Sequence, residues 1–115
     1  MSDKKTLFDA IDAQRDVLCS MADQIFDHPE YEGEEVFASG LLTDYLRANG
    51  FEVEMGVGGF KTAFRATYKR GEGGPKLGIL CEYDALRNLG HGCGHHLLGT
   101  ASVAAVDALK TYMEE

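Results

Sequence analysis

The sequence predicts a single α/β domain in which helices cover a small sheet. Apolar residues recur at helical spacing in three stretches, and the residues between the second and third stretches show the alternating or continuous apolar runs typical of strands. The length of 115 residues allows one hydrophobic core and no more. We therefore expect residues 1–115 to form one domain with the order helix, helix, strand, strand, strand, helix.

Two helices are predicted in the first half of the chain. The first begins near Thr6, a hydroxyl residue followed by Asp9 as in a capping box, and Pro29 stops it. Asn49-Gly50 ends the second, since both residues tolerate a left-handed backbone. The expected buried faces are Leu7, Ile11, Leu18, Ala22 and Ile25 in the first helix, and Phe37, Leu41, Leu42, Tyr45 and Leu46 in the second.

The pattern then changes to that of strands. Residues 51–57 alternate apolar and polar side chains, and 62–69 repeat this after a turn at Gly58-Gly59. Residues 76–81 are almost continuously apolar, which predicts a strand covered on both faces. A loop over residues 84–92 follows. The last helix is predicted from the spacing of Leu97, Ala101, Ala105, Ala108 and Tyr112.

Composition excludes several classes of partner. The net charge of −8 without clusters of Lys and Arg argues against nucleic acid. No apolar run is long enough to span a bilayer, and the first six residues lack the apolar stretch of a secretory signal. The three cysteines, Cys19, Cys81 and Cys93, do not form a disulfide framework. A cytoplasmic protein is expected, with Cys19 and Cys81 acting as small core residues.

The chemistry-bearing residues gather in one loop. His91, His95 and His96 lie within six residues of one another beside Cys93, and thiolate and imidazole are ligands that borderline-soft divalent metals prefer. The loop follows a predicted strand and opens a helix, where ligands gather in α/β sheets. A metal site is therefore predicted. A surface loop that is merely rich in His and Gly, or a redox thiol at Cys93, are the alternatives.

The acidic residues before this loop are open to two interpretations. Asp84, with Glu82, ends the third predicted strand, where a carboxylate either supports the metal site or simply faces water. Two other motifs give less evidence of a functional site. The glycines at 56–59 lack the Gly-Lys-Ser/Thr of a phosphate-binding loop and indicate a hairpin turn, and His28 is interpreted as a helix-end residue.

Three segments resemble the aminoacylase-like metallopeptidases. They are 82–86 (EYDAL), 90–95 (GHGCGH) and 97–101 (LLGTA), and the stretch from His28 to Glu30 is also similar to that family. The nearest branch holds the aminobenzoyl-glutamate hydrolases and the Xaa-Arg dipeptidases. The resemblance covers nearly the whole chain, and the Cys-Gly-His loop is its most specific part.

The resemblance implies roles for three residues. Cys93 and His95 match the two metal ligands of this loop in the cysteine-containing branch, and Asp84 matches an acid that supports the metal site from behind. His96 departs from the family, where Asn or Asp usually follows. Arg87-Asn88 replaces a common Pro-Gly, so the local geometry of the loop is where this chain is expected to differ.

The family also implies a fold and an activity. Its members have a zinc-peptidase-like α/β/α sandwich with two divalent metals, zinc or manganese, and hydrolyse N-acyl amino acids, dipeptides or aminobenzoyl-glutamate-like amides. Their general-base glutamate and remaining ligands lie downstream of this loop, and Glu114-Glu115 does not match that catalytic pair.

The chain is therefore expected to be an N-terminal fragment of the catalytic domain, inactive alone. Either a missing C-terminal half or a homo-oligomer would complete it. The alternative is a small non-catalytic metal-binding module or a degenerate remnant.

Overall fold

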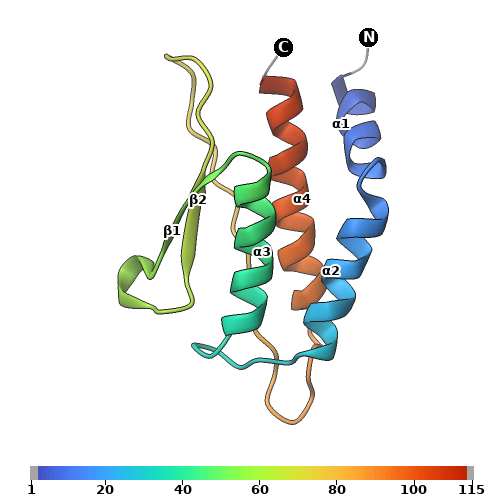
Figure 1. Ribbon diagram of the computed structural model, residues 1–115, viewed down its shortest axis with the longest axis vertical. Coiled ribbons are helices and arrows are strands. Elements are labelled where there is room, and N and C mark those ends of the chain that lie inside the picture. The colour runs from blue at the N-terminus through green and yellow to red at the C-terminus, as the bar shows by residue number, and fades with distance from the viewer. Residues whose placement is uncertain (1–2, 114–115) are drawn as a thin grey trace.

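The computed structural model describes residues 3–113, which form four α-helices and a two-stranded antiparallel sheet (Figure 1). Glu114 and Glu115 lie outside the described residues. The elements are α1 (Asp3–Asp12), α2 (Arg15–Asp27), α3 (Val36–Ala48), β1 (Glu52–Met55), the 3₁₀ turn η1 (Val57–Gly59), β2 (Phe64–Thr67) and α4 (His95–Met113). The mixed α/β class is confirmed, whereas the zinc-peptidase-like sandwich stays a prediction.

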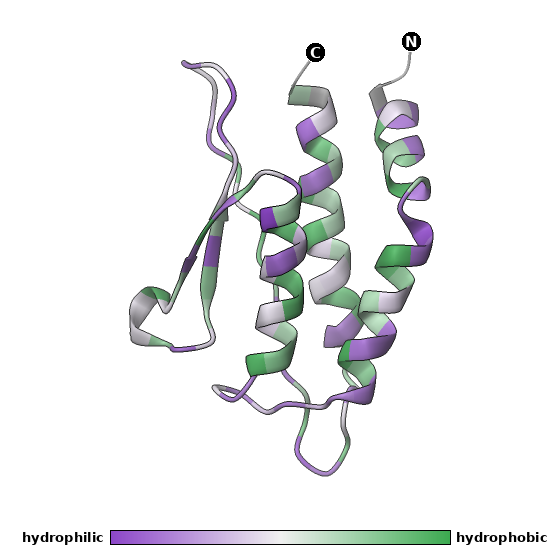
Figure 2. Cartoon of the chain, in the orientation of Figure 1, coloured by the Kyte–Doolittle hydropathy of each residue, from purple (hydrophilic) through white to green (hydrophobic). Residues whose placement is uncertain are grey.

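Helix α4 is at the centre of the packing. It contacts α1, α2 and α3, and the other side of α3 packs on the β1–β2 hairpin (Figure 1). Figure 2 shows hydrophobic residues along both α3 and α4, interrupted by hydrophilic ones. The buried core is Leu18, Met21, Ile25, Ala38, Leu42, Leu46, Phe51, Tyr83, Val103 and Ala104. Burial of these side chains is what holds the helices to one another.

The N-terminal region differs from the expected single helix. It forms two helices, and the first begins at Asp3, ahead of the cap predicted at Thr6. Leu18, Ala22 and Ile25 are buried as predicted, and Ile11 packs against the core. Cys19 is exposed, so its assignment to the core was wrong. It follows Leu18 by one residue, and adjacent residues on a helix do not share a face.

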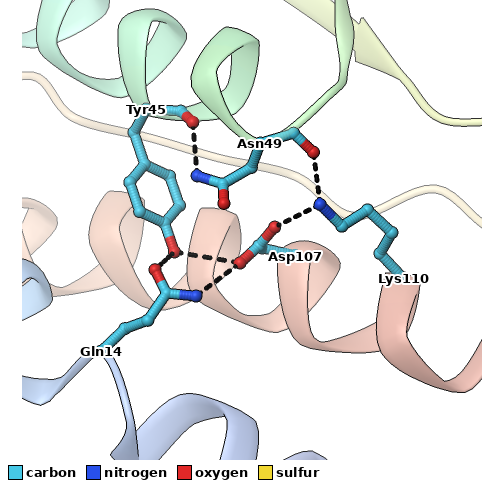
Figure 3. Close-up of polar contacts among 5 residues, drawn as sticks. All are labelled: Gln14, Tyr45, Asn49, Asp107 and Lys110. Carbon is cyan, nitrogen blue, oxygen red and sulfur yellow. Dashed lines mark hydrogen bonds and ion pairs between the residues drawn. The ribbon is translucent and has the colours of Figure 1, made fainter.

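A polar cluster lies at the break between α1 and α2 (Figure 3). Gln14 Nε2 donates to Asp107 Oδ2 at 2.9 Å, and Tyr45 Oη donates to Gln14 Oε1 at 2.5 Å. Lys110 Nζ lies 3.4 Å from Asp107 Oδ1 and also donates to the Asn49 carbonyl. Burial first, and then the Asp107 charge, raise the pKa of Tyr45. The cluster joins the α1–α2 break to α3 and α4, which explains why the helix is interrupted there.

The predicted second helix and the hairpin are confirmed. Helix α3 ends one residue before Asn49, and Gly50 has the left-handed φ of 91° that favours glycine. Strands β1 and β2 pair in antiparallel register from Glu52↔Thr67 to Met55↔Phe64. Both strands are shorter than predicted. The turn predicted at Gly58-Gly59 is formed by η1.

The prediction of a third strand over residues 76–81 is wrong. These residues form no strand, and most are exposed, including Leu77 at 78% and Leu80 at 88%. The order is therefore helix, helix, helix, strand, strand, helix. The physical reason is that a strand covered on both faces needs neighbouring strands, and within residues 3–113 the only sheet is the β1–β2 pair.

The last predicted helix is confirmed as α4, which begins at His95. Its buried face includes Ala108, but Leu97 and Ala101 are exposed, and Val103 and Ala104 are buried in their place. The side chain of Tyr112 lies outside the described part. Among residues 3–113, none of the helices combines the length and apolar character needed to cross a membrane.

Candidate functional site

The loop that leads into α4 brings Asp84 and His95 together. His95 Nδ1 lies 2.8 Å from Asp84 Oδ1 and 3.1 Å from the Asp84 carbonyl oxygen. Both are acceptors, so Nδ1 is the nitrogen that donates to Asp84, and Nε2 is the nitrogen on the other edge of the ring. The pair is largely buried, with side-chain exposures of 18% for His95 and 30% for Asp84. The structure thus brings the Asp84 carboxylate against the His95 ring, and the supporting role of Asp84 stays a prediction.

Cys93 lies on the opposite side of the His95 ring. Its Sγ is 3.6 Å from His95 Nε2, and the thiol is exposed. Zinc–sulfur bonds of about 2.3 Å and zinc–nitrogen bonds of about 2.0–2.1 Å at a tetrahedral angle would separate the two donors by about 3.6 Å. The spacing of Cys93 and His95 therefore fits two ligands of one divalent metal. Gly94 between them has a left-handed φ of 84°, which starts the turn into α4.

Two more histidines of the loop are close to this pair in sequence and pack on each other. The rings of His91 and His96 have centroids 5.3 Å apart, and Phe26 packs on His96 at 5.0 Å. Neither ring nitrogen of His91 makes a hydrogen bond of good geometry within the described residues, and neither does Nδ1 of His96. Buried polar atoms without partners are costly, so these nitrogens are further candidates to bind a ligand.

The charge state of His91 suits such a role. Burial lowers its pKa, and the neighbouring His96 and His95 lower it further, while the Ile25 backbone and the Asp84 charge oppose the shift. The neutral imidazole is the form that coordinates metals. Even so, no three His, Cys, Asp or Glu side chains in residues 3–113 are grouped closely enough to hold a metal ion by themselves. The residues present fit part of a metal site.

Glu30 fixes the loop that carries Asp84, a role that sequence analysis missed. Its carbonyl accepts a 2.7 Å hydrogen bond from the Ala85 amide. Its carboxylate accepts from the Phe37 and Ala38 amides, both at 2.8 Å, at the start of α3. Glu35 occupies the N-cap position of α3 without bonding there. Glu30 is only partly exposed, and its carboxylate caps the start of α3.

The residues just before Asp84 press closely on α4. A Cβ atom at Gly99 would lie 2.9 Å from the Glu82 carbonyl oxygen and 3.4 Å from Tyr83 Cβ. Tyr83 is buried, and its hydroxyl donates to the Thr62 carbonyl at 2.6 Å. These contacts hold the main chain on both sides of the candidate site. A groove of about 550 Å³ between α2 and α3 is lined by none of the site residues.

Comparison with known proteins adds to this geometry. No family model matches the chain. It is 41% identical over 93% of its length to a subunit of the p-aminobenzoyl-glutamate hydrolase of Escherichia coli, of which it covers 25%. The chain is homologous to this hydrolase subunit. It is also 35% identical over 96% of its length to the mouse Xaa-Arg dipeptidase and 32% identical over 92% to the human one, covering 28% and 27% of them.

The amidohydrolase and dipeptidase family inferred from the loop motifs is thereby confirmed. The chain spans about a quarter of the length of the curated relatives it matches. The names of those relatives describe an aminobenzoyl-glutamate hydrolase and dipeptidases that act on Xaa-Arg.

Proposed function

We propose that this chain supplies Cys93, His95 and Asp84 to the active site of a metal-dependent amide hydrolase. The proposal rests on two contacts of the His95 ring. Its Nδ1 lies 2.8 Å from Asp84 Oδ1, and its Nε2 lies 3.6 Å from Cys93 Sγ. Cys93 and His95 would hold a zinc or manganese ion. Asp84 would keep the His95 ring oriented and its tautomer fixed, as carboxylates behind ligating histidines do.

The proposed substrates are small amides, namely N-acyl amino acids, dipeptides or aminobenzoyl-glutamate-like compounds. The bound metal would polarise the amide carbonyl and make a water molecule more acidic. Because the Cys93 thiol is exposed, a small substrate could reach a metal ion bound to it. His91 and His96 are the nearest candidates for additional contacts, because both nitrogens of His91 and Nδ1 of His96 are buried and make no hydrogen bond of good geometry in the described part of the chain.

We propose further that the chain alone does not hydrolyse amides at a useful rate. A catalytic zinc site usually has three protein ligands and an open position, and residues 3–113 bring together only two proposed ligands at a bonding distance from a common ion. No proposed residue of this site is a general base, and such a base contributes about 10²–10⁴-fold. The remaining groups would come from the part of the relatives that the chain does not cover.

Cobalt substitution tests the ligand assignment directly. The chain loaded with Co²⁺ should show a thiolate-to-metal charge-transfer band, and Cys93→Ser should abolish it. Cys19→Ser is the matched control, because Cys19 is also exposed but has no histidine partner in the described structure, and its band should be unchanged. An unchanged spectrum in a metal-loaded Cys93→Ser variant would contradict the assignment.

One observation favours a second candidate function. The same line of Cys93, His95 and Asp84 is the arrangement in which an imidazole activates a thiol nucleophile and a carboxylate orients the imidazole. This alternative needs no metal. The two are distinguished in a completed enzyme by a chelator, which would stop a metal-dependent hydrolase and leave a thiol-dependent one active.

A further inference from the structure

The groove between α2 and α3 is built from one stripe of each helix. Its lining residues are Asp16, Val17, Ser20, Met21 and Gln24 on α2, and Leu41, Asp44 and Tyr45 on α3. Within each stripe, residues three or four apart repeat, which places them on one face of the helix. The surface of the groove is almost entirely apolar. Because none of the candidate site residues lines it, what binds there is independent of the proposed function.

The apolar surface of the groove is only partly covered by residues 3–113. Val17, on the α2 wall, is 52% exposed. Leu41 and Tyr45, on the α3 wall, pack against the core and are only partly buried. Covering such side chains is favourable, at about 25 cal/mol for each Å² of apolar surface removed from water. A partner with apolar side chains would therefore be stabilised here.

Two carboxylates flank one end of the groove. Tyr45 Oη donates to Gln14 Oε1, which places the start of α2 beside the end of α3, and Figure 1 shows the two helices antiparallel. Asp16, in the first turn of α2, and Asp44, next to Tyr45, therefore lie at the same end, one on each wall. Asp44 has a 3.7 Å contact with Arg47, but both side chains are exposed, and such pairs are weak.

The charge of this part of the chain has a single sign. Residues 16–46 hold eight Asp and Glu and no Lys or Arg, so their net charge of −8 equals that of the whole chain. The remaining residues are neutral overall. A surface with one sign of charge attracts partners of the opposite sign and repels partners of its own. The partner that fits this groove is therefore both apolar and cationic.

We infer that the groove between α2 and α3 docks a basic amphipathic helix of another protein. Apolar side chains on one face of that helix cover Val17 and Leu41, and Lys or Arg beside them pairs with Asp16 and Asp44. The lining residues of α2 extend about 12 Å along the helix, so two or three turns of the partner make contact. A small amphiphilic amine has similar chemistry, but the exposed walls of the groove would leave most of it in water.

Two synthetic peptides test the inference on the 115-residue chain. Both are about 14 residues long, have capped ends and carry leucine every three or four residues. One has lysine at the flanking positions and the other has glutamate. In NMR titrations of the ¹⁵N-labelled chain, the lysine peptide should shift the amides of the lining residues, more weakly when salt is raised from about 0.05 to about 0.5 M. The glutamate peptide should not bind. Shifts centred elsewhere, equal binding of both peptides, or no shift at about 1 mM lysine peptide overturn the inference.

Matched charge variants separate the groove from general attraction. Asp16→Asn combined with Asp44→Asn should weaken binding of the lysine peptide by about 5-fold or more. Asp23→Asn combined with Asp27→Asn removes the same charge from exposed positions of α2 that do not line the groove, and should change the affinity by less than about 2-fold. Equal weakening in the two double variants would mean a diffuse attraction and would refute the docking site.

A second pair of variants tests the apolar contact without changing charge. Val17→Ser should weaken binding of the lysine peptide by about 3-fold or more. Val36→Ser is the control, because Val36 is 65% exposed on α3 but does not line this groove, and the affinity should stay unchanged. Circular dichroism checks that each variant is folded. Equal affinities of the two variants contradict a docked apolar face.

Three measurements test the occupant. Dodecylamine stands for the small amphiphilic amine, and sedimentation shows whether the chain dimerises through the groove. A chimera, in which residues 1–115 replace the matched quarter of the Escherichia coli relative, shows whether the groove stays open in a longer protein. The lysine peptide should bind the chimera as it binds the chain. Dodecylamine binding as tight as that of the peptide, dimerisation that blocks the peptide, or loss of peptide binding in the chimera would each identify another occupant and overturn the inference.

Discussion

The main-chain amide of Ala85 donates a 2.7 Å hydrogen bond to the carbonyl of Glu30, which ties the residue after Asp84 to the segment between α2 and α3. The Glu30 carboxylate bonds in turn to the Phe37 and Ala38 amides at the start of α3. A single acidic residue thus joins the candidate site to a helix of the core. This arrangement gives the first testable prediction.

Glu30→Ala should lower the free energy of unfolding by about 0.5–2 kcal/mol, the usual effect of losing a helix cap. The loss is expected because two amides of α3 would be left without their acceptor and the favourable charge at the helix start would disappear. Urea unfolding measures the effect. Glu32→Ala, at an exposed position two residues away, is the control and should change little. Equal stabilities of the two variants would rule out the capping role.

Asp84→Asn should weaken the binding of Co²⁺ or Zn²⁺ by about 10- to 100-fold while leaving the fold intact. An amide can no longer attract the His95 Nδ1–H as a carboxylate does, so the ring loses its fixed tautomer. Metal titration followed by the cobalt spectrum measures the affinity. Glu82→Gln, exposed and two residues away, serves as the control. Wild-type affinity in Asp84→Asn would count against the supporting role.

Asp107→Ala should destabilise the protein by roughly 3 kcal/mol or more, as the removal of one partner of a buried ion pair does. Asp107 is 5% exposed, and its loss leaves Gln14 Nε2 without its acceptor and the Lys110 charge without its carboxylate partner. The matched control is Asp44→Ala, because Asp44 is exposed and lies 3.7 Å from Arg47 on the same helix. That surface pair should contribute about 0–1 kcal/mol. Thermal and urea unfolding of both variants would show whether the buried cluster holds the α1–α2 break.

Because of the partly buried thiol of Cys81, the free energy of unfolding should decrease at alkaline pH. Burial, and then the Glu82 charge, raise the pKa of its thiol from 9.0 to about 12. In the unfolded chain the thiol loses its proton near pH 9, where the folded protein still retains it. The unfolded state then binds fewer protons, so stability decreases as pH rises above 9.

The measurement compares the free energy of unfolding at about pH 8 and about pH 9.5, where most tyrosines and lysines of an unfolded chain still keep their protons. Tyr45 and Tyr83, whose pKa burial also raises, add a decrease of the same sign, so the comparison between variants isolates the thiol. The decrease should be smaller in Cys81→Ala than in the wild type. Cys19→Ala should keep the full decrease, because Cys19 is exposed. The same decrease in both variants would show that Cys81 is not its source.

Elements set by local pattern were predicted well. Helix α3, the hairpin and α4 follow from spacing and turn residues. The structure brings together the side chains of Cys93, His95 and Asp84, whose roles in a metal site stay a prediction. The break at Gln14 was not predictable, because its partners Tyr45 and Asp107 lie 31 and 93 residues away in sequence. The strand predicted at residues 76–81 does not form, for a related reason. Its apolar composition is typical of a buried strand, but in the structure of residues 3–113 most of the segment is exposed.

Gly99 places opposing demands on any future variant of this protein. It lies within α4, where alanine would favour the helix by about 1 kcal/mol over glycine. A methyl group there, however, would collide with the Glu82 carbonyl, which leads directly into Asp84. Selection for thermal resistance would therefore retain glycine despite the preference of helices for alanine, because a backbone carbonyl cannot move aside as easily as the end of a side chain. Alanine recovered at this position would show that the main chain entering the loop can move away from α4.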